Sequence, residues 1–117
     1  MNAEAIRNYC LSKQGAEEDY PFDEVTLVVK VAGKIFVLVF LDKIPLQINL
    51  KCDPEKAVEL REKLDCVSPG WHMNKKYWNT ITLNGNIQWS EIKEWIDHSY
   101  EEVIKKLSKS QKEKFLF

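Results

Sequence analysis

The chain has 117 residues, a net charge of −1, 44% hydrophobic residues and 30% charged residues. These values are typical of one soluble globular domain, and the near-neutral charge gives no global preference for an anionic partner. The longest strongly apolar run, IFVLVFL, is seven residues, whereas a membrane-spanning helix needs about 20. We therefore expect no membrane association.

The beginning of the chain and the cysteines indicate a compartment. The first ten residues, MNAEAIRNYC, contain no apolar signal region, so we expect a cytoplasmic protein. The three cysteines, Cys10, Cys52 and Cys66, are odd in number and widely spaced. This usage favours reduced thiols over a disulfide framework.

The chain opens with a predicted helix and an acidic connection. Asn2 is a suitable N-cap for a helix over about residues 3–14, and Gly15 can close it. The segment AEEDYPFDE follows, and Pro21 stops any helix there. We expect this segment to be an acidic loop.

A β-rich region comes next. The segment VTLVVKVAGKIFVLVFL predicts two strands, over about 25–31 and 34–41, which turn around Gly33. A third strand follows over about 46–52, where apolar and polar residues alternate. The strand over 34–41 is apolar on both faces, so either protein covers both sides or one side meets a partner.

The second helix has a clear start. Asp53 can accept hydrogen bonds from the first-turn amides, and Pro54 fits the first helical position. The helix is predicted over 53–66, and VSPGW breaks it. Residues 77–83 then form a predicted strand in which Trp78 and Ile81 lie on opposite faces.

The remaining segments predict a turn, a short strand and a final helix. Asn84 and Gly85 are a strong tight-turn signal before a short strand over 86–89. Ser90 can cap a last helix over about 91–107. We expect the polar tail to fray.

The order α-β-β-β-α-β-β-α lacks the alternation of a parallel sheet. It predicts an α+β two-layer sandwich, with an antiparallel sheet and helices on one face. We expect one domain over 1–109 and a C-terminal tail over 110–117.

Motifs of common enzymes and metal sites are absent from the sequence. There is no GxGxxG loop, no Walker loop, no GxSxG and no CxxC. The two histidines are His72 and His98, and a metal site built from Cys66, His72 and distant acids has no recognised spacing. We expect neither cofactor nor metal, and a protein that is not an enzyme.

The stretch WHMNKKYWNT, residues 71–80, lies in the acid-free segment 67–90. Aromatic rings interleaved with lysines can stack on bases while the ammonium groups meet phosphates. The alternative is ordinary: the rings join helices to the sheet, and Lys75 and Lys76 are solvated. Both readings stay open, and they differ in whether Trp71 or Trp78 is exposed beside the lysines.

Three segments carry a resemblance to a known family. SPGWHMNKKYWNTITLNG (68–85), SYEEVIKKL (99–107) and the early NYCLSKQGAEEDYPFDEVTLVVKVAGKIFVLV resemble the MmcQ/YjbR family of small bacterial proteins. The resemblance covers roughly residues 1–109. It implies an α+β YjbR-like domain of the kind grouped with secretion chaperones, and a DNA-binding role.

Three functions remain in competition. The first is a non-enzymatic protein that binds DNA through the sheet, its hairpins and the 67–80 loop, since the helices are acidic or balanced. The candidate nucleic-acid-binding residues are Lys34, Lys43, Trp71, His72, Asn74, Lys75, Lys76 and Trp78. The second is a protein-interaction or chaperone-like module, with a protein partner or as a homodimer. The third is a small-ligand or enzymatic site around Trp71, His72 and Trp78.

Overall fold

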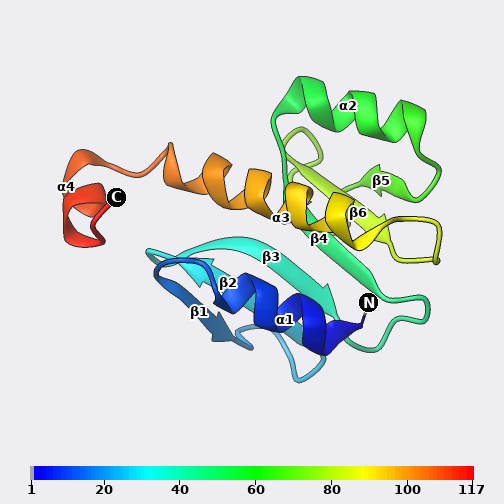
Figure 1. The fold of residues 1–117 in the computed structure, drawn as a ribbon, viewed down its shortest axis with the longest axis horizontal. Helices are drawn as coiled ribbons and strands as arrows, with labels where there is room; N and C mark the ends of the chain where they lie inside the picture. The colour runs from blue at the N-terminus through cyan, green and yellow to red at the C-terminus, as the bar shows by residue number, and fades with distance from the viewer. Residues whose placement is uncertain (1) are drawn as a thin grey trace.

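The computed structural model describes residues 2–117, which form four helices and six strands (Figure 1). The helices are α1 (Ala3–Leu11), α2 (Pro54–Lys63), α3 (Trp89–Ile104) and α4 (Lys109–Lys114). The strands are β1 (Ala16–Asp19), β2 (Thr26–Val31), β3 (Lys34–Phe40), β4 (Gln47–Lys51), β5 (Val67–Pro69) and β6 (Trp78–Thr82). They form one sheet in the order β1-β2-β3-β4-β6-β5, with every neighbouring pair antiparallel. The predicted α+β fold with an antiparallel sheet is confirmed.

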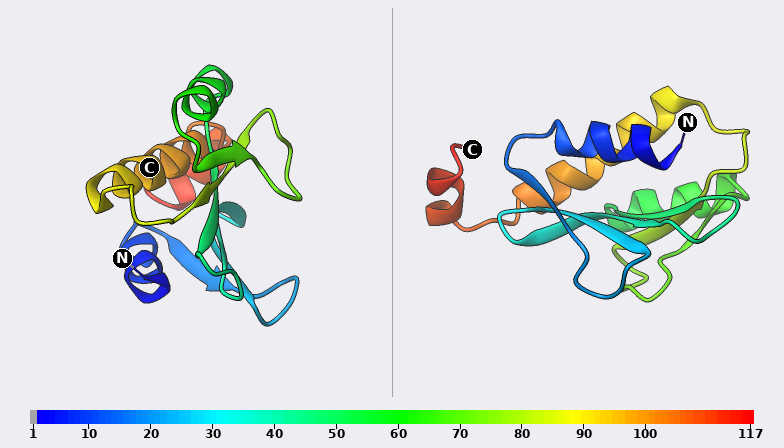
Figure 2. Two further views of the ribbon diagram at one scale, coloured as in Figure 1. Left: turned by 90° about the vertical axis from the view of Figure 1, so that its right-hand side faces the viewer. Right: turned by 90° about the horizontal axis from the view of Figure 1, so that it is seen from below.

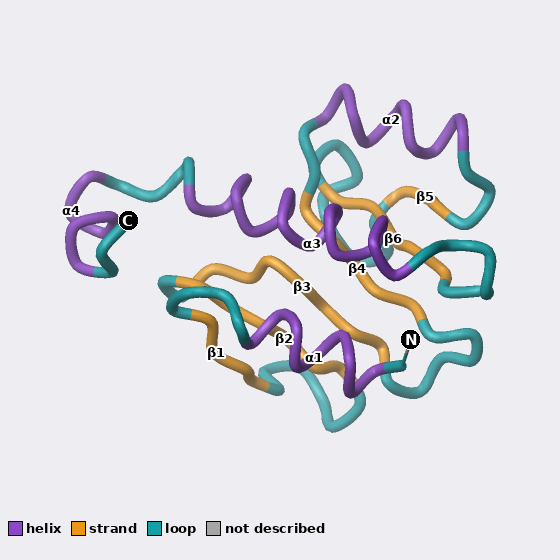
Figure 3. Tube along the Cα trace, in the orientation of Figure 1, coloured by secondary structure: helices purple, strands orange, loops and turns teal. Residues whose placement is uncertain are grey.

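The layers are plain in three views. Helices α1 and α3 lie along one face of the sheet, and α2 packs beside β5 and β6 (Figures 1 and 3). The β1–β2 loop (20–25) and the β5–β6 loop (70–77) project on the opposite side from α1 and α3 (Figure 2, left). We call that side the outer face of the sheet.

Both faces of the sheet carry buried apolar residues. The main core lies between the sheet and the helices and includes Phe36, Ile48 and Ile96, all fully buried. A smaller cluster on the outer face consists of Val28, Leu38, Phe40 and Trp78. The two-sided apolar pattern of the 34–41 strand is therefore covered by the chain itself.

Two predicted helix starts are confirmed. The Oδ1 of Asn2 accepts a hydrogen bond from the Ala5 N–H at 2.8 Å. The Oδ2 of Asp53 accepts one from the Lys56 N–H at 3.2 Å. The first helix ends at Leu11, earlier than predicted, because the chain turns there to enter β1.

Two strands were not predicted. The acidic connection was predicted as a loop, but residues 16–19 form β1 and pair with β2. The VSPGW segment was predicted as a break, but residues 67–69 form β5 and pair with β6. Both are short edge strands whose pairing uses backbone groups, so the side chains give no alternating apolar signal.

The predicted strand over 86–89 is wrong. It would have paired with β6, but β4 and β5 already occupy the two edges of β6. The chain instead enters α3 at Trp89, with Gln88 as the N-cap residue, so Ser90 lies inside the helix and is not its cap.

The tail predicted to fray is folded into α4. Ser108 and Gln111 form a capping box at its start. The ring of Phe117 then lies 6.2 Å from the ring of Tyr100, and the Gln14 side-chain amide donates to the Phe115 carbonyl at 3.0 Å. Side chains far apart in sequence thus hold the C-terminus in place.

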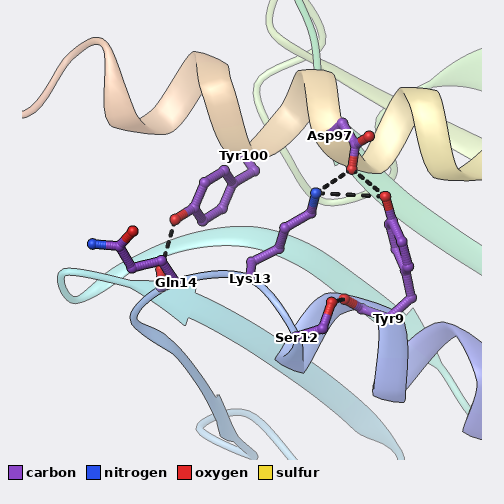
Figure 4. Close-up of polar contacts among 6 residues, drawn as sticks. All are labelled: Tyr9, Ser12, Lys13, Gln14, Asp97 and Tyr100. Atoms are coloured by element: carbon purple, nitrogen blue, oxygen red, sulfur yellow. Dashed lines mark hydrogen bonds and ion pairs between the residues drawn. The ribbon is translucent and has the colours of Figure 1, made fainter.

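Polar contacts join α1 to α3 (Figure 4). The Tyr9 hydroxyl donates to Asp97 Oδ1 at 2.5 Å, and Lys13 forms an ion pair with the same carboxylate. Burial opposes the charge of Lys13, but the Asp97 hydrogen bond and charge outweigh it and raise the pKa of Lys13. The Tyr100 hydroxyl of α3 also donates to the Gln14 carbonyl at 2.6 Å, so α3 contacts both α1 and the turn that follows it.

Candidate functional site

The two tryptophans of residues 71–80 have different environments. Trp78 is 7% exposed and packs into the outer-face cluster, whereas Trp71 is 44% exposed. The alternation within β6 was predicted correctly, because Trp78 faces away from Ile81, which lies in the main core. The exposed aromatic of the pair is therefore Trp71.

Buried side chains fix the backbone of Trp71. The Trp71 N–H donates to Thr80 Oγ1 at 2.8 Å, and the Asn49 amide donates to the Trp71 carbonyl at 2.8 Å. Thr80 Oγ1 in turn donates to Asn49 Oδ1 at 2.5 Å. Asn49 and Thr80 are almost fully buried, so this network of three bonds holds the Trp71 backbone in place without help from solvent.

The residues on either side of Trp71 let the chain turn sharply. Gly70 lies so close to Trp78 that a β-carbon on it would be 2.6 Å from the Trp78 β-carbon. His72 has a φ of 58°, a left-handed conformation that is uncommon outside glycine. The imidazole and indole ring centres are 4.1 Å apart. The turn presents Trp71 and His72 as a pair on the outer face.

The Trp71 ring separates two hollows. The first, of about 340 Å³, is lined by Phe22, Asp23, Thr26, Leu38, Phe40, Trp71, His72 and Met73. The second, of about 390 Å³, is lined by Lys43, Gln47, Ser68, Pro69, Trp71 and Thr80. The first has a mainly apolar wall and the second a mainly polar one. We call the two hollows together the Trp71 site.

Contacts to its own ring orient Trp71 further. The Phe40 ring meets it edge-on, with ring centres 5.3 Å apart and planes at 72°. Lys43 Nζ lies 5.0 Å from the centre of the same indole ring. The site thus combines a fixed aromatic surface with one cation.

Exposed apolar side chains lie at the same end of the sheet. They come from the β1–β2 loop and the β3–β4 loop (41–46). A hydrogen bond links the two loops, because the Leu41 N–H donates to the Val25 carbonyl at 2.8 Å. These residues, which we call the apolar rim, are Tyr20, Phe22, Val25, Leu41 and Ile44. Phe22 is 63% exposed and Ile44 is 98% exposed, which is unusual for such side chains.

The structure does not bring the predicted lysines onto one surface. Lys43 lies at the Trp71 site, but Lys34 is the first residue of β3 and lies at the other end of that strand. Lys76 Nζ lies 5.5 Å from the centre of the Tyr77 ring and not beside Trp71. The predicted nucleic-acid-binding residues therefore lie in more than one place on the molecule, and their role in binding stays a prediction.

Two other predicted residues have structural contacts within the same loop. Lys75 Nζ donates to the Gly70 carbonyl at 3.1 Å. Asn74 Oδ1 accepts a hydrogen bond from the Lys76 N–H at 2.9 Å, which is a local turn contact. Both side chains serve the conformation of the loop.

Comparison with known proteins identifies the family. The family model for YjbR matches residues 11–102. The chain belongs to the YjbR family. It is 30% identical to the protein YjbR of Escherichia coli K12 over 96% of this chain and 95% of that one. It is 33% identical to YbdF of Escherichia coli O157:H7 over 91% of this chain and 87% of that one. Both relatives are named as uncharacterised proteins.

Solved structures share the fold of this YjbR-family chain. A crystal structure of Deinococcus radiodurans protein DR2400 superposes with a TM-score of 0.92 at 33% identity, covering 97% of this chain and 87% of that one. A Pseudomonas syringae protein superposes with a TM-score of 0.75 at 28% identity, covering 87% of this chain and 98% of that one. The YjbR architecture is therefore shown by both sequence and structure.

Arg61 supports the site and was not among the residues predicted from the sequence. Arg61 projects from α2, and its Nε donates to Asn79 Oδ1 at 2.6 Å. Its guanidinium also donates to the carbonyls of Lys75 and Trp78, so it holds the end of the 70–77 loop. An arginine on a helix surface looks solvated in sequence, and no local pattern marks this role. Phe22 was also missed, because it lies in the predicted acidic loop.

The thiols of the YjbR-family chain are poor nucleophiles. Burial raises the pKa of Cys10 to about 12 and that of Cys52 to about 11. Burial also raises the pKa of Cys66. A thiolate is the reactive form of cysteine, so none of the three is prepared for attack.

Residues 2–117 contain neither a metal-type side-chain cluster nor a long apolar helix. No group of three or more His, Cys, Asp or Glu side chains in that range is placed to hold a metal ion. None of the helices in the same range has the length and apolarity needed to cross a membrane.

Proposed function

We propose that this YjbR-family protein is a non-enzymatic binding protein that uses the Trp71 site to bind an apolar or aromatic side chain of a protein partner. The observation that carries the proposal is the half-exposed Trp71 beside a cavity of about 340 Å³, with its backbone held by Asn49 and Thr80 and its ring packed edge-on against Phe40. The cavity has room for a side chain between Phe22 and Trp71.

The rigidity of Trp71 favours binding. Ordering a side chain at an interface costs about 0.5–1.5 kcal/mol, and a ring that is already fixed avoids that cost. Tryptophan is also among the residues that most often dominate the free energy of protein–protein binding. Asn49 and Thr80 would thus prepare the site before the partner arrives.

The apolar rim supports a protein partner over other classes. Exposed apolar side chains that gather at one place on a soluble protein mark interaction surfaces. Phe22 and Ile44 would extend the contact beyond the cavity, and the surrounding Asp23 and Lys43 would supply a polar border. A surface for duplex DNA would instead need several free cations.

A second candidate is single-stranded DNA, and one observation favours it. Lys43 Nζ lies 5.0 Å from the centre of the Trp71 ring. A base stacked on the exposed part of Trp71 could therefore place its phosphate near Lys43. This would be a small version of the DNA-binding role that the family resemblance implies.

The first test selects peptides from a random displayed library on the wild-type protein. We expect enrichment of peptides with Trp, Phe, Leu or Met, and at least a tenfold loss of their affinity in Trp71→Ala and Phe22→Ala. Val58→Ala is the matched control, because Val58 is an exposed apolar residue on α2. Sedimentation at several concentrations tests a second copy of this chain as the partner.

Single-stranded oligonucleotides provide the competing arm. If DNA is the ligand, Trp71→Ala should weaken binding by about 1–3 kcal/mol and Lys43→Ala should lower the salt slope by about 1. Selected peptides whose affinity is the same for wild type and Trp71→Ala would contradict the protein-partner proposal. Absence of binding to both peptides and DNA would remove the Trp71 site as a binding surface.

A further inference from the structure

A second surface of the molecule, separate from the Trp71 site, gathers four lysines. Lys34 begins β3, Lys51 ends β4, Lys76 lies in the 70–77 loop, and Lys106 follows α3. We call these four residues the lysine cluster. They come from four segments that lie far apart in the sequence, so only the fold brings them together.

Contacts to one ring place two members of the cluster. Lys106 Nζ lies 4.6 Å from the centre of the Tyr77 ring, and Lys76 Nζ lies 5.5 Å from the same centre. The negative face of an aromatic ring attracts cations, which helps to hold two ammonium groups in the same neighbourhood. Tyr77 therefore organises this surface.

Lys51 lies beside the other members. Strands β3 and β4 pair antiparallel with Val37 opposite Leu50, so Lys34 at the start of β3 and Lys51 at the end of β4 lie at the same end of that pair. The Lys51 side chain is half-buried, and burial, followed by the charges of Lys106 and Lys34, lowers the pKa of Lys51. Glu102 acts in the opposite direction but does not restore the ordinary value. Lys51 thus experiences more positive than negative charge.

None of the four lysines forms an ion pair within residues 2–117. The acids nearby have other partners. Glu102 is buried, and its carboxylate forms an ion pair with Lys105 Nζ at 2.5 Å. The Asp53 carboxylate caps α2 by accepting the Lys56 N–H. The cluster therefore keeps its positive charge.

A hollow of about 210 Å³ lies beside the cluster. Its lining residues are Lys51, Cys52, Asp53, Pro54, Tyr77, Glu102, Lys105 and Lys106. Lys51 and Lys106 of the cluster line it directly, together with Lys105. Space and positive charge thus coincide at this place.

We propose that the lysine cluster is a binding site for a small anion that carries one or two phosphate groups. Lysine ammonium groups bind phosphate as point charges from several directions, and a multiply charged anion gains most from such convergence. This site is independent of the proposed function of the Trp71 site.

The test uses inorganic pyrophosphate as the probe, at constant ionic strength, with binding measured by calorimetry and by NMR of the lysine side chains. We expect Lys51→Met and Lys106→Gln each to weaken pyrophosphate binding at least fivefold. Lys109→Gln is the matched control, because Lys109 is an exposed lysine on α4. Trp71→Ala should bind pyrophosphate as the wild type does.

A second readout does not depend on affinity alone. Binding of an anion at the cluster must raise the pKa of Lys51, because binding and protonation are linked. Equal losses in the cluster variants and in Lys109→Gln, or an unchanged pKa of Lys51 at saturating pyrophosphate, would overturn the inference. Binding of a single-stranded oligonucleotide without binding of pyrophosphate would also overturn it.

Discussion

Gly70 shows how one residue sets the geometry of the Trp71 site. Its N–H donates to the Trp78 carbonyl at 2.8 Å, and its α-carbon lies against the Trp78 side chain. No larger residue fits between the loop and β6 at this point. A glycine is needed at position 70 because any side chain there would collide with Trp78.

We predict that Gly70→Ala destabilises the protein by about 1–3 kcal/mol, which is the usual cost of overpacking. The added β-carbon would lie 2.6 Å from the Trp78 β-carbon and 2.8 Å from its carbonyl oxygen. Urea unfolding measures the change. Gly85→Ala is the control, because its added β-carbon meets nothing within 4 Å and only the φ of 91° is strained. A smaller loss for Gly70→Ala than for Gly85→Ala would contradict the spatial explanation.

At the scale of single residues, the sequence predicted which face of the sheet a side chain points to, but not how exposed that side chain is. The period of two placed Trp78 and Ile81 on opposite faces of the sheet, as found. It gave no means of knowing that the 70–77 loop would cover Trp78 and leave Trp71 half-exposed. Exposure depends on what packs above a residue, and that is a non-local property.

At the scale of elements, α3 supports an irregularity in the sheet. The pairing of β2 and β3 shifts by one residue at Phe36, and the β3–β4 ladder stops at Val37 and Leu50. The buried Ser99 hydroxyl donates to the Phe36 carbonyl at 2.5 Å and accepts from the Lys51 N–H at 2.8 Å. One helix side chain thus replaces a ladder hydrogen bond between two strands.

We predict that Ser99→Ala lowers the free energy of unfolding by about 2–3 kcal/mol, because a buried carbonyl and a buried N–H lose their partner. Chemical denaturation measures the loss, and hydrogen exchange should report a less protected Lys51 N–H. Ser90→Ala, on the exposed side of the same helix, should change stability by less than about 0.5 kcal/mol. Equal stability of the Ser99→Ala variant and the wild type would refute the bridging role.

Element prediction failed mainly at the edges. Strands β1 and β5 are short, mostly exposed and paired through backbone groups, so their side chains show no period. The long helices and the central strands were predicted because each has a buried face that repeats along the sequence. The failed strand over 86–89 depended on strand order, which no local pattern specifies.

At the scale of the whole molecule, His98 connects α3 with the start of α2. Its Nε2 accepts a hydrogen bond from the Asp53 N–H at 3.1 Å. Burial, followed by the charge of Lys56, lowers the pKa of His98, although Glu102 and Asp53 oppose the shift. The neutral ring is therefore the form that fits the folded protein.

We predict that this contact makes stability fall as the pH decreases below about 6.5, the ordinary pKa of histidine. The unfolded chain binds the proton more readily than the folded chain does, so protonation favours unfolding. The stabilisation is present above that pH and is lost as the pH falls through the folded-state pKa. Thermal unfolding between pH 7.5 and pH 5 measures the effect.

The matched variants are His98→Gln and His72→Gln. Glutamine can still accept the Asp53 N–H but does not titrate, so His98→Gln should show a smaller pH dependence than the wild type. His72→Gln is the control for the loss of a histidine that lies on the outer face, away from Asp53 and α2. If the slope persists in His98→Gln, another group is responsible.

The sequence by itself determined the class of fold, the family signature and the order of the main helices and strands. These follow from the periods of buried residues, from N-caps such as Asn2 and Asp53, and from a distinctive motif over residues 71–80. Only the tertiary structure decided that the residues of the 71–80 motif lie at two different surfaces. Trp71 lies at a cavity with Phe22, while Lys76 joins lysines of other segments around Tyr77. The physical reason is that a binding surface forms from residues that topology brings together, whereas local sequence patterns report only neighbours along the chain.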